Sequence, residues 1–107
     1  MGRENSIEKL IELVSDILRK PAMYEINNVE DLGLVIWGFK SATYLIKSEG
    51  EALTEFMTSF REFANKKFNS PIDSNWPRII RFYSSGDIGS LELFKITFNE
   101  FLGSVSK

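Results

Sequence analysis

The stretch RKPAMYEINNVEDLGLVIWGFKSA, residues 19–42, decides the fold of this chain. Lys20-Pro21 predicts the end of one helix, because the proline ring clashes with the preceding turn and proline lacks an N–H donor. Asn28 predicts the start of the next helix, where its side chain caps the first turn. The helix that follows is apolar around most of its circumference, which is typical of a helix at the centre of a bundle. We therefore expect two helices joined by a structured connection, with the second helix central.

Apolar residues recur at spacings of three and four along the rest of the chain, and this period indicates amphipathic helices. We expect five helices, over about 6–19, 28–47, 51–68, 76–84 and 90–103. Asn5 and Glu8 predict a capping box on the first helix, Gly50 predicts the end of the second, and Asn75 predicts the start of the fourth. No segment shows the alternation of a strand. The sequence therefore predicts an all-α, single-domain bundle over residues 1–107.

The composition removes most catalytic equipment. The chain has neither cysteine nor histidine, which excludes thiol nucleophiles, disulfides and the commonest zinc ligands. No phosphate-binding loop, EF-hand or HExxH spacing occurs. The carboxylate pairs Glu30/Asp31 and Asp87/Glu92 fall at predicted helix starts, where they offset the helix dipole. We expect no enzyme, no cofactor and no metal.

Charge and hydropathy bound the partners and the location. The net charge is −2 and the pI about 5.2, which argues against nucleic acid as the direct ligand. No apolar run approaches the ~18 residues of a membrane span. The N-terminal residues have no apolar segment typical of a signal peptide. We expect a cytoplasmic protein that does not enter a membrane.

The expected topology suggests a binding surface. Short connections make consecutive helices antiparallel neighbours, so the connection at 21–28 and the break at 69–75 should share one end of the bundle. The candidate partner-binding residues at that end are Tyr24, Glu25, Glu30, Asp31, Asp73 and Trp76. An acidic and aromatic rim of this kind suits a protein partner. The alternative for Met23 and Tyr24 is that they plug the end of the core.

Two glycines interrupt the predicted central helix. Gly33 and Gly38 each cost roughly 1 kcal/mol relative to alanine in a helix interior. Close approach of another helix would explain them, and chance tolerance is the alternative. The apolar excess on this helix also leaves open a homodimer that would cover it.

A series of residues carries a family resemblance. In chain order these are Leu13, Lys20, Pro21, Met23, Tyr24, Gly38, Phe39, Ala42, Phe60, Phe63, Ser74, Asn75, Trp76, Ile79 and Ile80, followed by a Leu/Phe helix from Leu91 to Leu102. This order, over about residues 10–102, resembles small all-helical immunity proteins encoded beside bacterial polymorphic and contact-dependent growth-inhibition toxins. Ala22 stands where that family commonly has glycine, and Glu25-Ile26 replaces an apolar residue followed by glycine.

The resemblance implies a binding protein with no activity of its own. Such a protein occludes the active site of a cognate toxin C-terminal domain, often a nuclease and here expected to be a ribonuclease, in a 1:1 complex. An acidic inhibitor surface would suit a basic nuclease cleft in sign and would speed association. The alternatives are a helical adaptor or chaperone-like module without a toxin partner, and a carrier of a small ligand or lipid in the Phe-rich interior.

Overall fold

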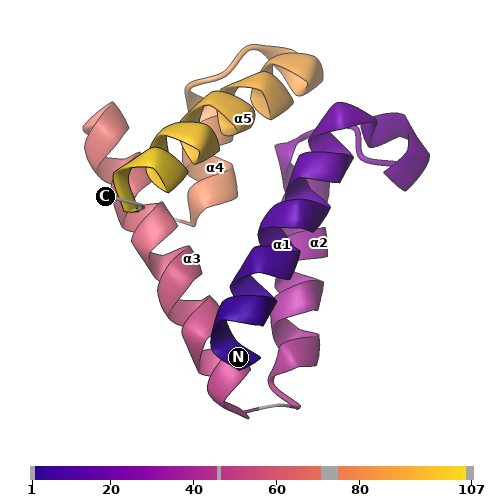
Figure 1. Ribbon diagram of the computed structural model, residues 1–107. Coiled ribbons are helices and arrows are strands. Elements are labelled where there is room, and N and C mark those ends of the chain that lie inside the picture. The colour runs from indigo at the N-terminus through magenta and orange to yellow at the C-terminus, as the bar shows by residue number, and fades with distance from the viewer. Residues whose placement is uncertain (1, 46, 71–74, 106–107) are drawn as a thin grey trace.

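The computed structural model describes residues 2–45, 47–70 and 75–105 of the chain. Every regular element in the described part is a helix, which confirms the predicted all-α class (Figure 1). The elements in chain order are α1 (Gly2–Arg19), the 3-10 turn η1 (Pro21–Tyr24), α2 (Val29–Thr43), α3 (Lys47–Phe68), α4 (Trp76–Phe82) and α5 (Gly86–Val105). In Figure 1, α1 rises from the N-terminus, α2 descends beside it and α3 rises again at an angle to both. The α4 and α5 helices lie in the space between α3 and the α1–α2 pair.

The α2 helix contacts all four of the other α-helices, as expected of a central helix, and α3 does the same. Val29, Leu32 and Ile36 form the buried side of α2. The burial is one-sided, however, because Leu34 is 70% exposed and Trp37 is 63% exposed. The described residues therefore leave part of the apolar circumference of α2 exposed.

Aromatic packing holds α4 and α5 against α3. The fully buried Phe60 of α3 lies with its ring centroid 5.5 Å from those of Trp76 and Phe94. It lies 5.4 Å from the rings of Phe98 and Phe101 of α5. These edge-to-face arrangements are favourable ones for aromatic pairs. One aromatic cluster thus connects three helices.

Side-chain caps begin two of the helices, as predicted. Asn28 Oδ1 accepts the Asp31 N–H at 2.9 Å, and Asn75 Oδ1 accepts the Arg78 N–H at 3.1 Å. A third side chain joins two helix starts: the buried Ser90 Oγ accepts the Val29 N–H at 3.0 Å. Because that N–H is one of the unpaired donors of the first turn of α2, Ser90 attaches α5 to the start of α2.

Three predicted boundaries are wrong. The α1 helix begins at Gly2, so the predicted cap position, Asn5, lies inside the helix rather than before it. The α2 helix ends at Thr43, and Gly50 lies inside α3 rather than ending a helix. A Cβ atom on Gly50 would lie 2.9 Å from the Cα of Tyr44. This glycine is therefore needed for the close approach of the chain after α2 to α3, not for a helix stop.

The start of the last helix also differs from the prediction. The α5 helix begins at Gly86 instead of about Ser90, so the expected turn at 84–89 is shorter. Gly86 has a φ of +71°, which glycine adopts without steric cost. The chain reverses there and enters α5 at once.

Candidate functional site

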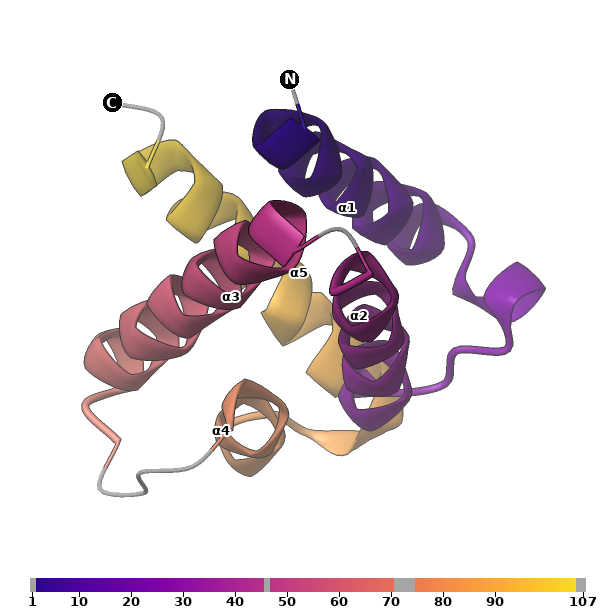
Figure 2. The ribbon, with the colours of Figure 1, turned by 90° about the horizontal axis from the view of Figure 1, so that it is seen from below.

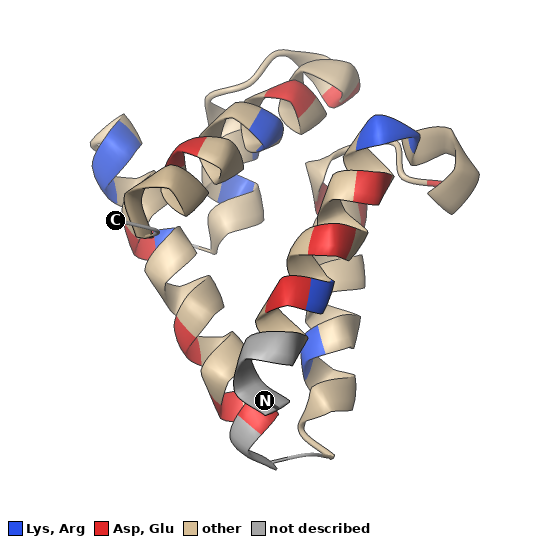
Figure 3. Ribbon diagram, viewed as in Figure 1, with Lys and Arg blue, Asp and Glu red and all other residues tan. Residues whose placement is uncertain are grey.

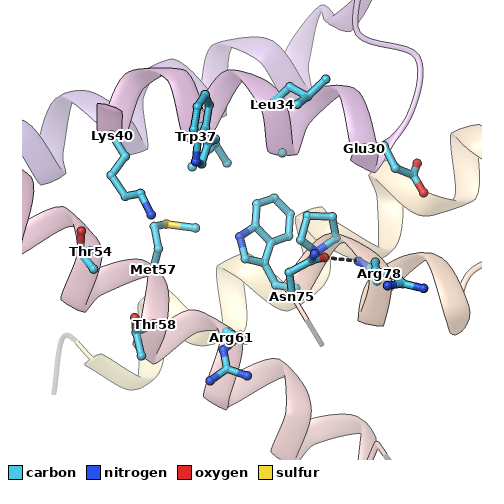
Figure 4. A pocket seen from close by; sticks show the side chains of 14 residues that line it. Glu30, Leu34, Trp37, Lys40, Thr54, Met57, Thr58, Arg61, Asn75 and Arg78 are labelled. Atoms are coloured by element: carbon cyan, nitrogen blue, oxygen red, sulfur yellow. Dashed lines mark hydrogen bonds between the residues drawn. The ribbon is translucent and has the colours of Figure 1, made fainter. Parts of the chain in front are cut away.

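An open groove of about 530 Å³ lies between α2 on one side and α3 and α4 on the other (Figure 4). We call it the α2–α4 groove. Its apolar lining comes mainly from Gly33, Leu34, Ile36 and Trp37 of α2, Met57 of α3, and Trp76 and Pro77 of α4. A concave apolar site of this size, with a few polar groups at its edge, is the usual form of a binding site.

The groove begins where α4 comes closest to α2. A Cβ atom on Gly33 would lie 2.9 Å from Pro77 Cγ and 3.9 Å from the Trp76 ring. The glycine therefore allows the first turn of α4 to rest directly on α2, and the close-approach explanation holds for Gly33. For Gly38 it does not hold, since no described atom lies within 4 Å of the corresponding Cβ position.

The buried side chains form a rigid floor for the groove. Trp76 lines it and is itself largely buried, with its ring 5.1 Å from that of Phe94. Ile36 and Met57, also buried, belong to the same core. The floor is therefore part of the packed interior, so it keeps its shape without a ligand.

Two exposed apolar residues stand above this floor. Leu34 and Trp37 are three residues apart on α2 and so lie on the same face of the helix. Figure 4 shows the Trp37 side chain on α2, between Lys40 and Leu34. Exposed tryptophan beside a preformed apolar pocket is characteristic of residues that dominate protein–protein binding.

The charges around the groove are mostly positive. Lys40 of α2, Arg61 of α3 and Arg78 of α4 line it, against a single acid, Glu30. Lys40 and Arg78 form no ion pair with any residue that the structure describes. Lys40 and Arg78 therefore place two positive charges without a described acidic partner at the rim, although the whole chain has a net charge of −2.

Glu30 is already engaged by Arg81 of α4. The guanidinium binds both carboxylate oxygens, with distances of 2.9 Å from Nε and 2.8 Å from Nη2, and also binds Asp87 of α5 at 2.8 Å. The hydrogen bonds from Arg81 lower the pKa of both carboxyl groups. This three-residue network connects the N-terminal turns of α2 and α5 through α4, and it reduces the negative charge that Glu30 offers to a partner.

The predicted partner-binding residues do not all share one surface. Glu30 and Trp76 line the α2–α4 groove. Asp31 lies in the first turn of α2, where its carboxylate accepts the Asn27 N–H at 2.9 Å. Asp73 lies outside the described residues. Of the remaining two, Tyr24 is the last residue of η1 and Glu25 follows it; Figure 2 shows η1 on the opposite side of α2 from α4.

The η1 turn does not plug the core. Met23 is 75% exposed and Tyr24 is also exposed, whereas the buried residue of this connection is Ile26. The Tyr24 hydroxyl donates to the carboxylate of Asp16, which Arg19 also binds. The hydrogen bond from Tyr24, and to a smaller extent that from Arg19, lowers the pKa of Asp16. Tyr24 thus fastens the turn to α1, and Glu25 follows it in a left-handed conformation with φ of 57°.

The acidic residues are spread over the molecule. Figure 3 shows them along α1, α3 and α5 as well as at the start of α2. The expected gathering of acids at one end is therefore not the dominant charge feature of the described surface. The groove residues Leu34, Trp37 and Lys40 are absent from the sequence-based candidates. Leu34 and Trp37 are apolar residues off the main stripe of the helix, a pattern that predicts burial on all sides, and nothing in the sequence singles out Lys40.

Comparison of the chain with protein-family models, with curated proteins and with solved structures found no match. No helix in the described ranges combines the length and hydropathy that crossing a membrane requires. Within the same ranges, no three acidic side chains are grouped so that they could hold a metal ion.

Proposed function

We propose that this chain is an immunity protein that binds a cognate toxin domain in a 1:1 complex and neutralises it. The toxin is expected to be a nuclease, in particular a ribonuclease, whose active site the bound protein covers. The observation that carries the proposal is the exposed Leu34–Trp37 face of α2 above the α2–α4 groove. Such a face is costly to leave in water, and a protein partner would cover it.

The family resemblance supports the choice of a toxin as that partner. The residues that carry it include Pro21, which ends α1, and Tyr24, which binds Asp16. They also include Trp76 and Ile80, which belong to the core. Most of the matching residues are structural. The resemblance therefore supports the assignment to the class of immunity proteins. The exposed surface would determine which toxin the protein recognises.

Calorimetric titration against the toxin C-terminal domain encoded immediately upstream tests the proposal. The expected result is 1:1 binding with a Kd near or below nanomolar, about −12 kcal/mol, and loss of the toxin's nuclease activity at the equivalence point. Binding without loss of activity would exclude neutralisation. Absence of binding would refute the proposed function as a whole.

The second candidate is a helical adaptor without a toxin partner. A groove between helices is also the form of site that takes a short helical segment of another protein. The discriminating result is binding to a short peptide with no effect of the chain on any toxin activity.

A further inference from the structure

We propose that the α2–α4 groove is the docking site for an acidic amphipathic helix of the partner protein, whose apolar side enters the groove. The identity of that partner as a toxin rests on the proposed function. The chemistry of the docked segment does not, because it follows from the shape and the charges of the groove.

The dimensions suit two to three turns of a helix. The α2 side of the groove extends from Glu30 to Lys40, and ten residues of α-helix correspond to about 15 Å. Apolar side chains at positions i, i+4 and i+7 of a docked helix would span about 10 Å. The groove is therefore long enough for three such anchors against its buried floor and the exposed face of Leu34 and Trp37.

The charges select an acidic segment. Lys40 stands toward one end of the groove, and Figure 4 shows its side chain reaching from α2 toward Met57. Arg78 stands on α4 toward the Glu30 end. Neither forms an ion pair with a described residue, so carboxylates on a docked helix would supply the missing partners. A basic segment would instead meet like charges at both ends.

This charge pattern also places the groove relative to a nuclease. A cleft that binds nucleic acid is basic, and the positive rim of the groove would repel it. If the partner is a nuclease, the docked acidic helix would therefore lie outside its catalytic cleft.

The chain provides its own reporter for this site. Its only two tryptophans are Trp37 and Trp76, and both line the groove. Intrinsic tryptophan emission therefore reports directly whether the groove is occupied. The probes are two peptides of about 18 residues with leucine at i, i+4, i+7 and i+11. One has glutamate at most of the other positions, and the other has lysine there.

The acidic peptide is expected to shift the tryptophan emission to the blue and to bind at least about tenfold more tightly than the lysine peptide at low salt. The double variant Lys40→Glu, Arg78→Glu is expected to reverse this preference. The control is the double variant Lys9→Glu, Lys95→Glu, which makes the same change in net charge on exposed parts of α1 and α5 away from the groove. It should keep the preference of the natural protein.

Several results would overturn the inference. One is that both peptides bind with similar affinity, and a second is that neither peptide binds. A third is that the Lys40→Glu, Arg78→Glu variant still prefers the acidic peptide. A blue shift that depends on protein concentration, with dimers in sedimentation, would assign the groove to a second copy of this chain. A response to a nucleotide such as AMP but not to the peptides would assign it to a small anionic aromatic ligand.

Titration with the toxin domain separates this inference from the proposed function. Suppose that the toxin domain binds and is inhibited, but its binding does not change the tryptophan emission, and the Lys40→Glu, Arg78→Glu variant binds it as tightly as the natural protein. The docking site is then wrong, and the immunity function stands. If the acidic peptide binds as expected and the toxin domain does not, the groove assignment stands and the immunity function is refuted.

Discussion

Alanine substitutions at Gly33 and Gly38 of α2 are expected to change stability in opposite directions. Both glycines lie inside the helix, so alanine gains up to about 1 kcal/mol of helix propensity at either position. At Gly38 the added methyl group meets no described atom within 4 Å, so the gain is kept. At Gly33 the methyl group would lie 2.9 Å from Pro77 Cγ, closer than carbon atoms approach without a shift.

The cost at Gly33 depends on what must move. The Pro77 ring is closed onto the backbone of the first turn of α4, so it cannot rotate away as a flexible side chain would. Relief therefore moves α4 against α2, and overpacking of this kind costs about 1–3 kcal/mol. After the propensity gain, Gly33→Ala should lie between neutral and about 2 kcal/mol destabilising. The two variants should differ by about 1–3 kcal/mol.

Urea unfolding followed by circular dichroism measures both free energies of unfolding. Gly33→Ala combined with Pro77→Ala supplies the control, because it removes the ring that causes the clash. A double-mutant cycle should give a coupling of about 1 kcal/mol or more in favour of the combined variant. Equal stabilisation by Gly33→Ala and Gly38→Ala would refute the reasoning, since it would mean that α4 does not rest on α2 at this point.

Three further substitutions test other parts of the fold. Ser90→Ala should cost about 1–3 kcal/mol in the same urea experiment, because it leaves the N–H of the fully buried Val29 without an acceptor; a loss well below this range would contradict that role. Glu25→Gly should raise the free energy of unfolding by about 0.5–1 kcal/mol, since glycine tolerates the left-handed conformation better than glutamate, and a decrease would show that the Glu25 side chain stabilises the turn. Arg81→Ala should flatten the acid side of the stability–pH curve, because Arg81 lowers the folded-state pKa of Glu30 and Asp87. The stability that these two carboxylates supply is fully present above the ordinary carboxyl pKa of ~4 and is lost as the pH falls through their lowered pKa values. An unchanged curve between pH ~5 and ~2 would show that these pairs do not contribute.

Local features were predictable because they depend on neighbours in the chain. The periodicity of apolar residues locates the helices, and Pro21 ends α1 through its own ring and missing N–H. Asn28 and Asn75 cap α2 and α4 as predicted, since a cap needs only the three residues that follow it. The error at Gly50 has the opposite cause, because its role depends on the approach of Tyr44, which local signals do not report.

The candidate site was predictable only in part. Trp76 and Glu30 were identified from the sequence, and both line the groove. The charge state of that surface could not be foreseen, because Arg81, which engages Glu30, is 51 positions away along the chain. The same holds for Trp37: the sequence shows that this residue is apolar, but its exposure depends on where the other helices pack.

By itself, the sequence determined that this protein is helical, where its helices lie and which residues cap two of them. Only the tertiary structure decided that the α2 face carrying Leu34 and Trp37 remains uncovered and that cations stand around the groove beside it. The physical reason is that helix formation depends on interactions within a few residues, whereas the covering of a helix face depends on where other helices pack. Here the absence of a side chain at Gly33 lets Pro77 of α4 rest on part of α2, while Leu34 and Trp37 on the same helix stay exposed.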